Sequence, residues 1–460
     1  MEATLSAPRT PRVRALPQPG DGPGDGPAGA LANPYRPGGR AWAVTAMMVA
    51  LMVINFADKA VLGLASVPIM DELGLSSGEY GTIASSFYLL FSLSGVIVGL
   101  LSNRVRTTWI LGVLAFLWSV TSLPLLIAAS VPMLYASRIA LGAAEGPTSP
   151  MTVHAVQKWF PEDRRSVPTA LTQMGGALGL AIASPVLVYM IRHHGWRSAF
   201  VTLAAAGLVW VALWTVIGRE GPLTGAAPES PDADARAETR ADAGALAEPD
   251  IPYRRLFLNR TWIGGLVAGI GGYWSLALHG AWLPAYLEKV LGHSASETGR
   301  IIVLPSLFGA VVLLVVPWLG GVWMRRGASG RAARGIVGGA LVVAAGLCVV
   351  ALQYAPSGWK IPLLTVAFGL PNVIFPLTLL TTSQIVPARR RGSVLATTVA
   401  IVTFSGVAAP AVTGRIIDAA ATRAAGFEHA YLTAAAILVV CGAVGMLTID
   451  PERDARRLGL

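Results

Sequence analysis

Four ionisable side chains interrupt stretches of this sequence that are otherwise apolar: Asp58, Lys59, Arg138 and Glu145. Each charge costs roughly 2.5–3.5 kcal/mol at the centre of a membrane-spanning helix. Salt bridges that only hold two helices together are a weak source of stability. Charged side chains in such places more often line a pathway for a solute, an ion or a proton. We therefore predict that these four residues form a functional site, with a structural pair of salt bridges as the alternative.

The spacing of these residues predicts how their side chains are arranged. Arg138 and Glu145 are seven residues apart, which returns them to one helix face within roughly 20° and about 10 Å apart along the axis. Gly142 lies between them on that face and is expected to leave open space. Asp58 and Lys59 are neighbours that point about 100° apart, so they pair poorly with each other. We expect both to face a shared cavity, where Arg138 and Glu145 supply partners.

Two cations and two carboxylates sum to zero charge, so the site attracts an anion little while all four are ionised. A proton on Glu145 or Asp58 would release Lys59 or Arg138 to bind a substrate carboxylate, so that proton uptake and anion binding favour each other. This argument predicts a proton-coupled symporter of a small organic anion. Lys59 and Arg138 are the predicted substrate-binding cations, and Asp58 and Glu145 the predicted proton-coupling groups.

Other function classes fit the sequence less well. A proton-independent facilitator or exchanger is the nearest alternative, followed by an anion sensor that transports nothing. An enzyme is not expected because no nucleophile–base pair or metal-ligand cluster is evident. The only cysteines, Cys348 and Cys441, have no disulfide framework or metal-ligand spacing. No metal or cofactor is therefore predicted.

The composition indicates which elements must position these residues. The chain has 460 residues, of which 54% are hydrophobic and 13% charged, whereas soluble domains contain about 25% charged residues. Such a chain must face lipid over much of its surface. Charge-free stretches long enough to cross a membrane occur at 80–103, 107–137, 166–191, 198–218, 261–287, 301–324, 335–359, 361–388, 392–414 and 429–449. The run 107–137 is divided by a turn at 128–132, and with the interrupted spans 41–68 and 131–156 the expected number is twelve.

Polar segments divide these spans into two sets of six. Residues 219–259 are predicted to be a cytoplasmic linker because 219–255 is rich in Ala, Pro and charge. A "GLLSNR" sequence at 99–104 and a "GVWMRR" sequence at 321–326 stand at corresponding places in the two sets, as expected for a repeat. The sequence therefore predicts a disordered N-terminal tail at 1–40, six-helix bundles at 41–218 and 260–450, and a short tail at 451–460.

The net charge of +10 belongs mainly to one side of the predicted membrane. Of the 35 Lys and Arg residues, 26 lie in alternate loops and the two terminal regions. This alternation predicts cytoplasmic termini in the cytoplasmic membrane. It assigns the basic charge to orientation and lipid headgroups, and no nucleic-acid partner is expected.

The motifs around these charges resemble the major facilitator superfamily, and within it the anion:cation symporter family. The resemblance covers about residues 42–450 and is carried by "NFADKAVLGLASVPIMDELGLS" (55–76), "RIALGAAEGP" (138–147), "KWFPEDRR" (158–165) and "HGWRSAF" (194–200). It implies alternating access between two bundles and transport of sugar acids or aromatic and aliphatic carboxylates, commonly with protons. It also implies the roles already assigned to Lys59, Arg138, Asp58 and Glu145.

Two departures from the family pattern concern Lys59 and the first cytoplasmic loop. The family usually has Arg at the position of Lys59, so the two-pronged grip of a guanidinium on a carboxylate is lost. The loop motif of the superfamily, which implies a gating role, survives as Gly99, Asn103 and Arg104, with Asn103 replacing the usual acid. This replacement weakens any salt-bridge latch in that loop.

Four further residues are candidates for contact with substrate. Tyr88, Gln173 and Asn372 offer polar groups within predicted spans, although such groups also serve to join helices. His279 is either a hydrogen-bonded packing residue or a cavity group that titrates near neutral pH. The expected partners are a small organic anion, protons and membrane lipid, with the protein acting as a monomer.

Overall fold

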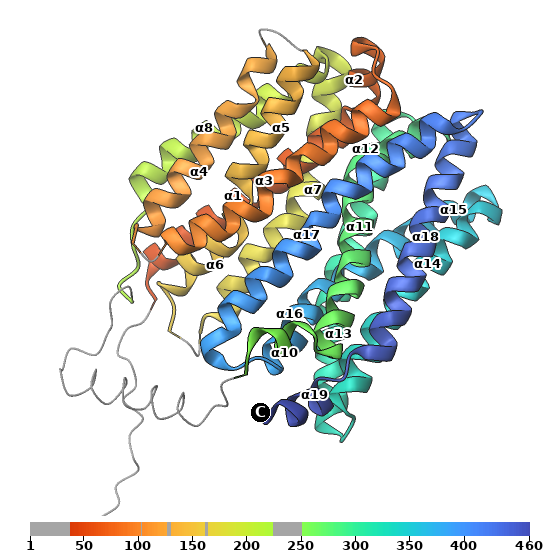
Figure 1. Cartoon of the computed structure of the whole chain (residues 1–460). Helices are drawn as coiled ribbons and strands as arrows, with labels where there is room; N and C mark the ends of the chain where they lie inside the picture. The colour runs from red at the N-terminus through yellow and green to blue at the C-terminus, as the bar shows by residue number, and fades with distance from the viewer. Residues whose placement is uncertain (1–36, 103, 127–129, 162–163, 224–250) are drawn as a thin grey trace, which may run out of the picture. The chain divides into compact units, whose positions relative to one another are not determined.

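The computed structural model describes residues 37–102, 104–126, 130–161, 164–223 and 251–460, and this part of the chain is helical with no β-strand (Figure 1). Before residue 224 its helices are α1 Gly39–Leu64, α2 Ser66–Leu73, α3 Ser77–Leu101, α4 Thr107–Thr121, η1 Leu123–Leu126, α5 Val131–Glu145, α6 Thr148–Gln157, α7 Ser166–His194 and α8 Trp196–Ile217. After residue 250 they are α10 Tyr253–Phe257, α11 Arg260–Lys289, α12 Ala295–Ile301, α13 Val303–Arg325, η2 Arg331–Ile336, α14 Val337–Tyr354, α15 Ser357–Gly369, η3 Leu370–Val373, α16 Ile374–Gln384, α17 Ala388–Ala419, α18 Arg423–Thr448 and α19 Pro451–Leu458.

Eleven helical segments among the described residues are long and apolar enough to cross a membrane. The predicted span 131–156 is instead divided into α5 and α6 at Gly146 and Pro147, so neither piece has the required length. Proline has no N–H to donate and its ring opposes the preceding turn, which explains the break. With α5 and α6 taken as one interrupted span, the structure agrees with the predicted all-α, twelve-span membrane fold.

Several helices end where polar residues or glycine satisfy the free backbone groups. Ser76 and Glu79 form a capping box at the start of α3, and Ser294 and Glu297 form another at the start of α12. Such boxes bind two backbone N–H groups that lack partners within the helix. The helix α2 ends at Gly74, whose φ of 64° lies in the left-handed region that glycine adopts without strain. These local signals fix where the chain turns between spans.

Helices from each half of the sequence pack mainly on one another. In the first half, α1 packs along α7 and α3 along α5, and in the second half α18 packs along α11 and α14. The two halves meet through α3 with α17 and through α1 with α11. Large apolar side chains point outward from the spans, among them Leu100, Trp109 and Trp318. This outer surface fits lipid and not water.

The packing of α3 on α5 corrects one prediction about the face that carries Arg138 and Glu145. Gly142 was expected to leave open space, but a Cβ atom on this residue would lie 1.8 Å from the backbone oxygen of Phe87. The glycine therefore allows the backbones of α3 and α5 to approach closely, as small residues do between membrane helices. The spacing did not predict that α3 covers this face of α5.

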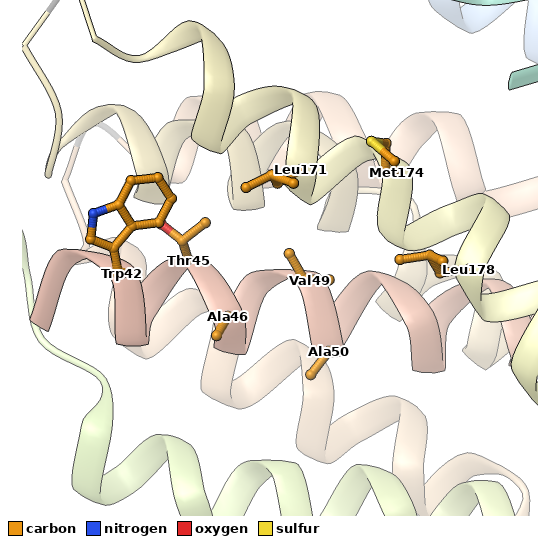
Figure 2. Close-up of a pocket in the computed structure, with 8 residues that line it drawn as sticks. All are labelled: Trp42, Thr45, Ala46, Val49, Ala50, Leu171, Met174 and Leu178. Atoms are coloured by element: carbon orange, nitrogen blue, oxygen red, sulfur yellow. The ribbon is translucent and has the colours of Figure 1, made fainter. Parts of the chain in front are cut away.

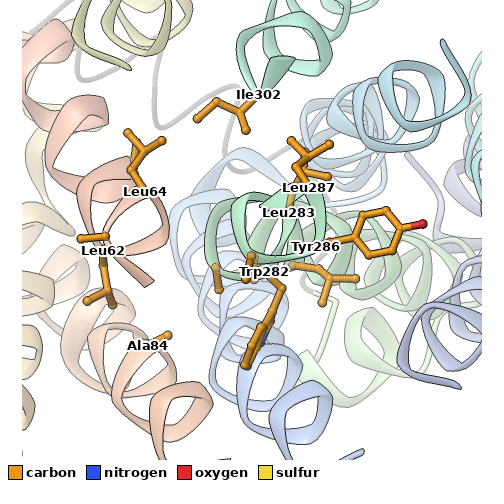
Figure 3. Packing of buried hydrophobic residues seen from close by; sticks show 14 of the residues in the cluster. Leu62, Leu64, Ala84, Trp282, Leu283, Tyr286, Leu287 and Ile302 are labelled. Atoms are coloured by element: carbon orange, nitrogen blue, oxygen red, sulfur yellow. The ribbon is translucent and has the colours of Figure 1, made fainter. Parts of the chain in front are cut away.

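A buried apolar cluster closes the helix ends around α2 and joins residues from both halves (Figure 3). It brings the C-terminal end of α1 and part of α3 against the C-terminal end of α11. The labelled members of the cluster are Leu62, Leu64, Ala84, Trp282, Leu283, Tyr286, Leu287 and Ile302. The cluster therefore joins helices of the two halves at this end.

Polar contacts between the halves accompany this cluster. The Asp418 carboxylate of α17 accepts hydrogen bonds from the backbone N–H groups of Ser77 (2.9 Å) and Gly78 (2.6 Å) at the start of α3. The Lys289 ammonium lies 3.3 Å from the Asp71 carboxylate. The first contact places a negative charge at the positive end of a helix, where it is stabilising.

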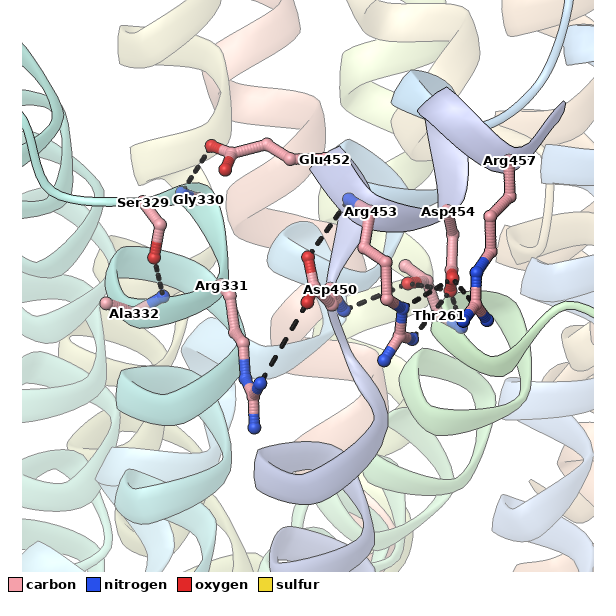
Figure 4. A network of polar contacts seen from close by, with 10 residues as sticks. All are labelled: Thr261, Ser329, Gly330, Arg331, Ala332, Asp450, Glu452, Arg453, Asp454 and Arg457. Atoms are coloured by element: carbon pink, nitrogen blue, oxygen red, sulfur yellow. Dashed lines mark hydrogen bonds and ion pairs between the residues drawn. The ribbon is translucent and has the colours of Figure 1, made fainter. Parts of the chain in front are cut away.

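The opposite end of the helices carries α10 and α19 (Figure 1), and here acidic residues cap helices within one half. In the second half, Glu452 accepts a 2.6 Å hydrogen bond from the Gly330 N–H, and Asp454 accepts from the Thr261 N–H (3.0 Å) and hydroxyl (2.8 Å). Arg331 lies 4.0 Å from Asp450 in the same network (Figure 4). Together these contacts join α19 to the starts of α11 and η2.

A corresponding cap stands in the first half. Glu220, just after α8, accepts from the backbone N–H groups of Thr107 (3.3 Å) and Thr108 (3.2 Å) at the start of α4, and it pairs with Lys158. Burial acts to raise the pKa of Glu220, but these hydrogen bonds outweigh it and hold the pKa below its usual range. In each half, an acid after the last span thus caps the third span.

The predicted tail 1–40 and linker 219–259 lie largely outside the described residues, which begin at 37 and omit 224–250. The described end of the linker contains the short helix α10. The predicted C-terminal tail 451–460 contains α19, whose acidic residues form the network of Figure 4.

Candidate functional site

Lys59 and Glu145, from α1 and α5, face each other across the interior of the first half. The Lys59 Nζ atom lies 3.9 Å from Glu145 Oε2, and it donates a 2.7 Å hydrogen bond to Asn55 Oδ1, one turn earlier on α1. The Lys59 side chain is 27% exposed, whereas that of Glu145 is fully buried. An amide oxygen therefore holds the ammonium beside the carboxylate, while part of the Lys59 side chain stays exposed.

Two aromatic rings also contact the Lys59 ammonium. Nζ lies 4.6 Å from the ring centroid of Phe56 on α1 and 5.4 Å from that of Phe91 on α3. Ring faces attract a cation at these distances without donating or accepting hydrogen bonds. The ammonium thus has neighbours that stabilise its charge but leave donor capacity for a further ligand.

Glu145 has an incomplete set of partners. Neither of its carboxylate oxygens has a hydrogen-bond partner within the described part of the chain, although Lys59 lies at ion-pair distance. A buried carboxylate is normally hydrogen-bonded as well as paired, because losing water is costly. This group can therefore take up a proton without breaking an existing hydrogen bond.

Arg138 lies deeper in the first half than Lys59. Its side chain is buried, with Nη2 3.5 Å from the Ser122 hydroxyl and the guanidinium carbon 5.2 Å from the centroid of Phe200. Its Nε atom has no hydrogen-bond partner among the residues that the structure describes. Asp58 is also buried. Of the four predicted charges, Lys59 has the accessible side chain.

The four charged groups nevertheless act on one another. Arg138 and Lys59 are the cations that interact electrostatically with Asp58. Glu145 interacts with Lys59, Asp58 and Arg138. In a medium of low dielectric constant such interactions remain strong over several ångströms. A change of charge at one carboxylate, by proton transfer, therefore changes the energy of both cations.

Tyr88, a predicted substrate contact, lies beside these groups on α3. Its ring meets that of Phe91 at 6.2 Å and that of Tyr273, on α11, at 5.8 Å, both edge to face. A Cβ atom on Gly406 of α17 would lie 2.7 Å from the Tyr88 ring, so the ring packs directly on the backbone there. Tyr88 thus connects the surroundings of Lys59 to helices of the second half.

A comparison with protein families identifies the fold that holds this site. The sequence profile of the Major Facilitator Superfamily matches residues 47–410, which is most of the chain. The chain belongs to the Major Facilitator Superfamily.

Similar proteins from bacteria are transporters by name. A probable L-galactonate transporter of Escherichia coli K12 is 30% identical over 275 residues, which are 59% of this chain and 60% of that protein. A probable sulfoacetate transporter of Cupriavidus necator is 27% identical over 268 residues, which are 58% of this chain and 62% of that protein. The matched region thus spans less than two thirds of each relative.

A solved structure supports the major facilitator fold. The crystal structure of a bacterial homologue of the human lysosomal transporter Spinster, in an inward-facing and occupied conformation, matches with a TM-score of 0.74. The match covers 91% of this chain and 98% of that one, at 16% sequence identity. At this identity the likeness concerns the fold alone.

The three other predicted substrate contacts, Gln173, His279 and Asn372, have neighbours other than Lys59. The exposed Gln173 of α7 exchanges 3.4–3.5 Å hydrogen bonds with Ser149 of α6. His279 of α11 is buried, with Nε2 3.2 Å from the Ile302 oxygen and its ring stacked on Phe368 at 5.7 Å. Its neighbours are those of a packing residue.

Asn372 and the loop motif complete the predicted set. Asn372 packs against α13, where a Cβ atom on Gly309 would lie 2.2 Å from Asn372 Nδ2. Gly99 has open space around it, and the Arg104 backbone N–H donates to Leu101. Asn103 lies outside the described residues.

The sequence analysis did not identify Asn55, Phe56 and Phe91 beside Lys59, or Tyr273 beside Tyr88. Asn55 and Phe56 precede Lys59 by four and three residues, so helical spacing already places them on its face of α1. Phe91 and Tyr273 come from other helices, and no local pattern in the sequence indicates these contacts.

An apolar groove lies between α1 and α7 (Figure 2). It contains none of the charged residues described above, and none of its lining residues carries a charge. Its lining residues are Trp42, Thr45, Ala46, Val49, Ala50, Leu171, Met174 and Leu178. Within the described residues no three His, Cys, Asp or Glu side chains gather to hold a metal ion.

Proposed function

We propose that this protein transports a small organic anion across a membrane and binds its acidic group at the Lys59 ammonium. The observation that carries this proposal is the partly exposed Lys59 side chain, whose ammonium lies 3.9 Å from a buried carboxylate inside a membrane fold. Placing a cation within the membrane costs free energy, so a cation in this position usually has a function. The relatives named for L-galactonate and sulfoacetate also point to an organic anion. Arg138 is the second cation, and it acts on the anion through the field of the site.

Transport is coupled to protons through Glu145, with Asp58 as the second proton-coupling group. Protonation of Glu145 removes the negative charge that competes with the substrate for Lys59. Anion binding and proton binding then favour each other, and both ligands cross the membrane together. The Glu145 oxygens have no hydrogen-bond partner among the described residues. This supports the role, because a proton can bind without breaking an existing hydrogen bond.

Alternating access moves the bundles 41–218 and 260–450 relative to each other around this site. The contacts of Asp418 and of the cluster in Figure 3 would close one side, and their release would open it. Tyr88 contacts the substrate from the first bundle, and the loop with Gly99 and Arg104 takes part in gating. The alternating basic loops support cytoplasmic termini in the cytoplasmic membrane.

Proteoliposomes containing the Glu145→Gln variant test the coupling. The probe is whichever of gluconate, benzoate and succinate stabilises the purified protein against heat. Wild-type protein should accumulate this anion in response to a proton gradient. The variant should lose accumulation but still exchange labelled for unlabelled anion, because a neutral amide mimics the protonated carboxyl. An exposed carboxylate on α18 provides the control, Glu428→Gln, which should behave as wild type.

Other outcomes would favour the alternatives. Accumulation that survives in Glu145→Gln contradicts the proton role of this residue. Anion flux without any proton movement indicates a facilitator or exchanger. Binding that Lys59→Gln abolishes, with no flux in the wild type, indicates an anion sensor.

A further inference from the structure

Aromatic rings form a continuous row that starts at Lys59 and crosses between the two halves of the chain. Phe56 and Phe91 flank the ammonium at 4.6 and 5.4 Å. Tyr88 follows Phe91, Tyr273 of α11 follows Tyr88 at 5.8 Å, and Phe375 of α16 follows Tyr273 at 6.2 Å. The five rings thus come from four different helices.

All five rings are partly exposed although they lie on membrane-spanning helices. The hydroxyl groups of Tyr88 and Tyr273 donate to no other described residue. The nearby hydroxyls of Ser92 and Thr403 bond to each other, which uses part of their capacity. Polar atoms without a hydrogen-bond partner in the described part of the chain also occur on Asn55, Arg138 and Glu145, but these atoms are buried. The exposed groups along the row are therefore mainly ring faces and edges, together with the two tyrosine hydroxyls.

This chemistry distinguishes between classes of organic anion. A sugar acid has a hydroxyl on nearly every carbon, and each hydroxyl that loses water without gaining a partner costs about 1–3 kcal/mol. A flat apolar body instead gains contact area and edge-to-face or stacked geometry with rings. Ligand sites of this kind are lined mainly by apolar side chains, with a few polar groups that fix orientation.

We propose that the anion bound at Lys59 has an aromatic or similarly flat, apolar body, which lies against Phe91, Tyr88 and Tyr273. This inference rests on the proposed function, since Lys59 must bind the acidic group. It makes Tyr273 a specificity-determining residue, because that ring reaches the substrate from the second half. The two tyrosine hydroxyls are free to bind one or two polar substituents on the ring of the substrate.

Binding to the purified full-length protein tests this inference, with benzoate and gluconate as probes at mildly acidic pH. Benzoate should bind about tenfold more tightly than gluconate. Tyr273→Leu should weaken benzoate binding roughly five- to tenfold, the equivalent of losing one aromatic pair and its contact area, and should change gluconate binding less than twofold. Tyr273→Phe should retain the affinity for benzoate, and Lys59→Gln should abolish binding of both anions.

Tyr189→Leu is the matched control. The Tyr189 ring packs on His193 at the end of α7, so its loss should change neither affinity. If Tyr273→Leu fails to fold, the affinity of the wild-type protein for benzoate relative to gluconate still tests the inference. Gluconate binding as tight as benzoate binding overturns the inference and leaves the proposed function standing. Failure of both anions to bind in a Lys59-dependent way overturns the proposed function and the inference with it.

Discussion

Lys59 owes its character to the residues that surround its ammonium. An amide oxygen, a carboxylate and two rings are its neighbours, and the amide of Asn55 is the one at hydrogen-bond distance. Because Glu145 is 3.9 Å away, the ion pair is loose. An anion that enters the site can therefore compete with Glu145 for the ammonium. Asn55 is therefore a positioning residue that holds the cation ready for its ligand.

Replacing Asn55 should weaken anion binding without preventing folding. In Asn55→Leu the ammonium loses its acceptor and moves toward Glu145, so the tighter ion pair competes with the anion. We expect an affinity about tenfold lower, equivalent to about 1.4 kcal/mol, measured with benzoate on purified protein. In Asn55→Asp a carboxylate of the protein pairs with the ammonium and competes with the anion, so the loss of affinity should be larger. Wild-type affinity in Asn55→Asp would show that Asn55 does not position Lys59.

The charged residues of this site were predictable, but its neutral residues were only partly so. Lys59 and Glu145 stand out because a charge in an apolar stretch needs a reason. Asn55 could have been predicted from its spacing of four residues from Lys59. Phe91 and Tyr273 were not, because their types are common in membrane helices and only the packing of α3 and α11 brings them to the site.

At the scale of helices, the close packing of α3 on α5 positions the helix that carries Glu145. Gly142 has no side chain where the Phe87 oxygen approaches. The helix pair keeps this approach along its length, since a Cβ atom on Gly146 would lie 1.9 Å from the Phe91 oxygen. The position of α5, and with it Glu145, therefore depends on glycine at these points.

Gly142→Ala should destabilise the protein, because the new methyl group forces α3 and α5 apart. Overpacking of this kind costs typically about 1–3 kcal/mol, which thermal unfolding in detergent would detect as a lower Tm. Gly358→Ala in the first turn of α15 is the control, since a Cβ atom there meets nothing within 4 Å. Equal Tm values for Gly142→Ala and the wild type would contradict the tight packing of α3 on α5.

Helix caps make the stability of the protein depend on pH. Glu220 binds the start of α4 and pairs with Lys158, which holds its pKa below the unfolded value of about 4.3. A carboxylate with a depressed pKa contributes stability above that unfolded value and loses it as pH falls through the folded pKa. We expect Glu220→Gln to lower Tm at neutral pH, with a difference from wild type that shrinks on acidification.

The control for this measurement is Glu428→Gln, which removes an exposed carboxylate of α18. Its Tm should follow that of the wild type across the pH range. A Tm difference between Glu220→Gln and the wild type that grows on acidification would have the wrong sign for a cap of this kind.

The positions of the spans were largely predictable, since their length and lack of charge are set by the membrane. The break between α5 and α6 was not predicted, although Pro147 was visible in the sequence. Proline is common in membrane helices, and whether it bends or ends one depends on neighbouring helices. The capping roles of Glu220 and Glu452, which follow the last span of each half, were likewise not predicted. Their partners lie more than a hundred residues away in the sequence.

At the scale of the whole molecule, the two halves are in contact at the end that carries α2. Apolar packing and the Asp418 cap act together there. The sequence predicted two halves from the linker and the repeated loops, but not which end is closed. That choice depends on small differences between two packings of the same helices, which local patterns do not report.

Asp418→Ala should shift the protein toward an arrangement that is open at this end. The variant removes the acceptor for the Ser77 and Gly78 N–H groups. These groups can then form hydrogen bonds to water when this end is open, which favours the open arrangement. Ala84 lies in the apolar cluster and is 6% exposed, so a cysteine there is shielded while this end is closed. With Cys348 and Cys441 replaced by serine, Ala84→Cys should react with a water-soluble maleimide about tenfold faster when Asp418→Ala is added, for a shift of about 1.4 kcal/mol.

The salt bridge at the same end provides the matched comparison. The Asp71 side chain is 59% exposed, and ion pairs at the surface contribute about 0–1 kcal/mol. Asp71→Asn should therefore change the labelling of Ala84→Cys far less than Asp418→Ala does. If Asp71→Asn opens this end as much as Asp418→Ala, or if neither changes the labelling rate, then the cap on α3 does not hold the two halves together, and the apolar cluster alone keeps that end closed.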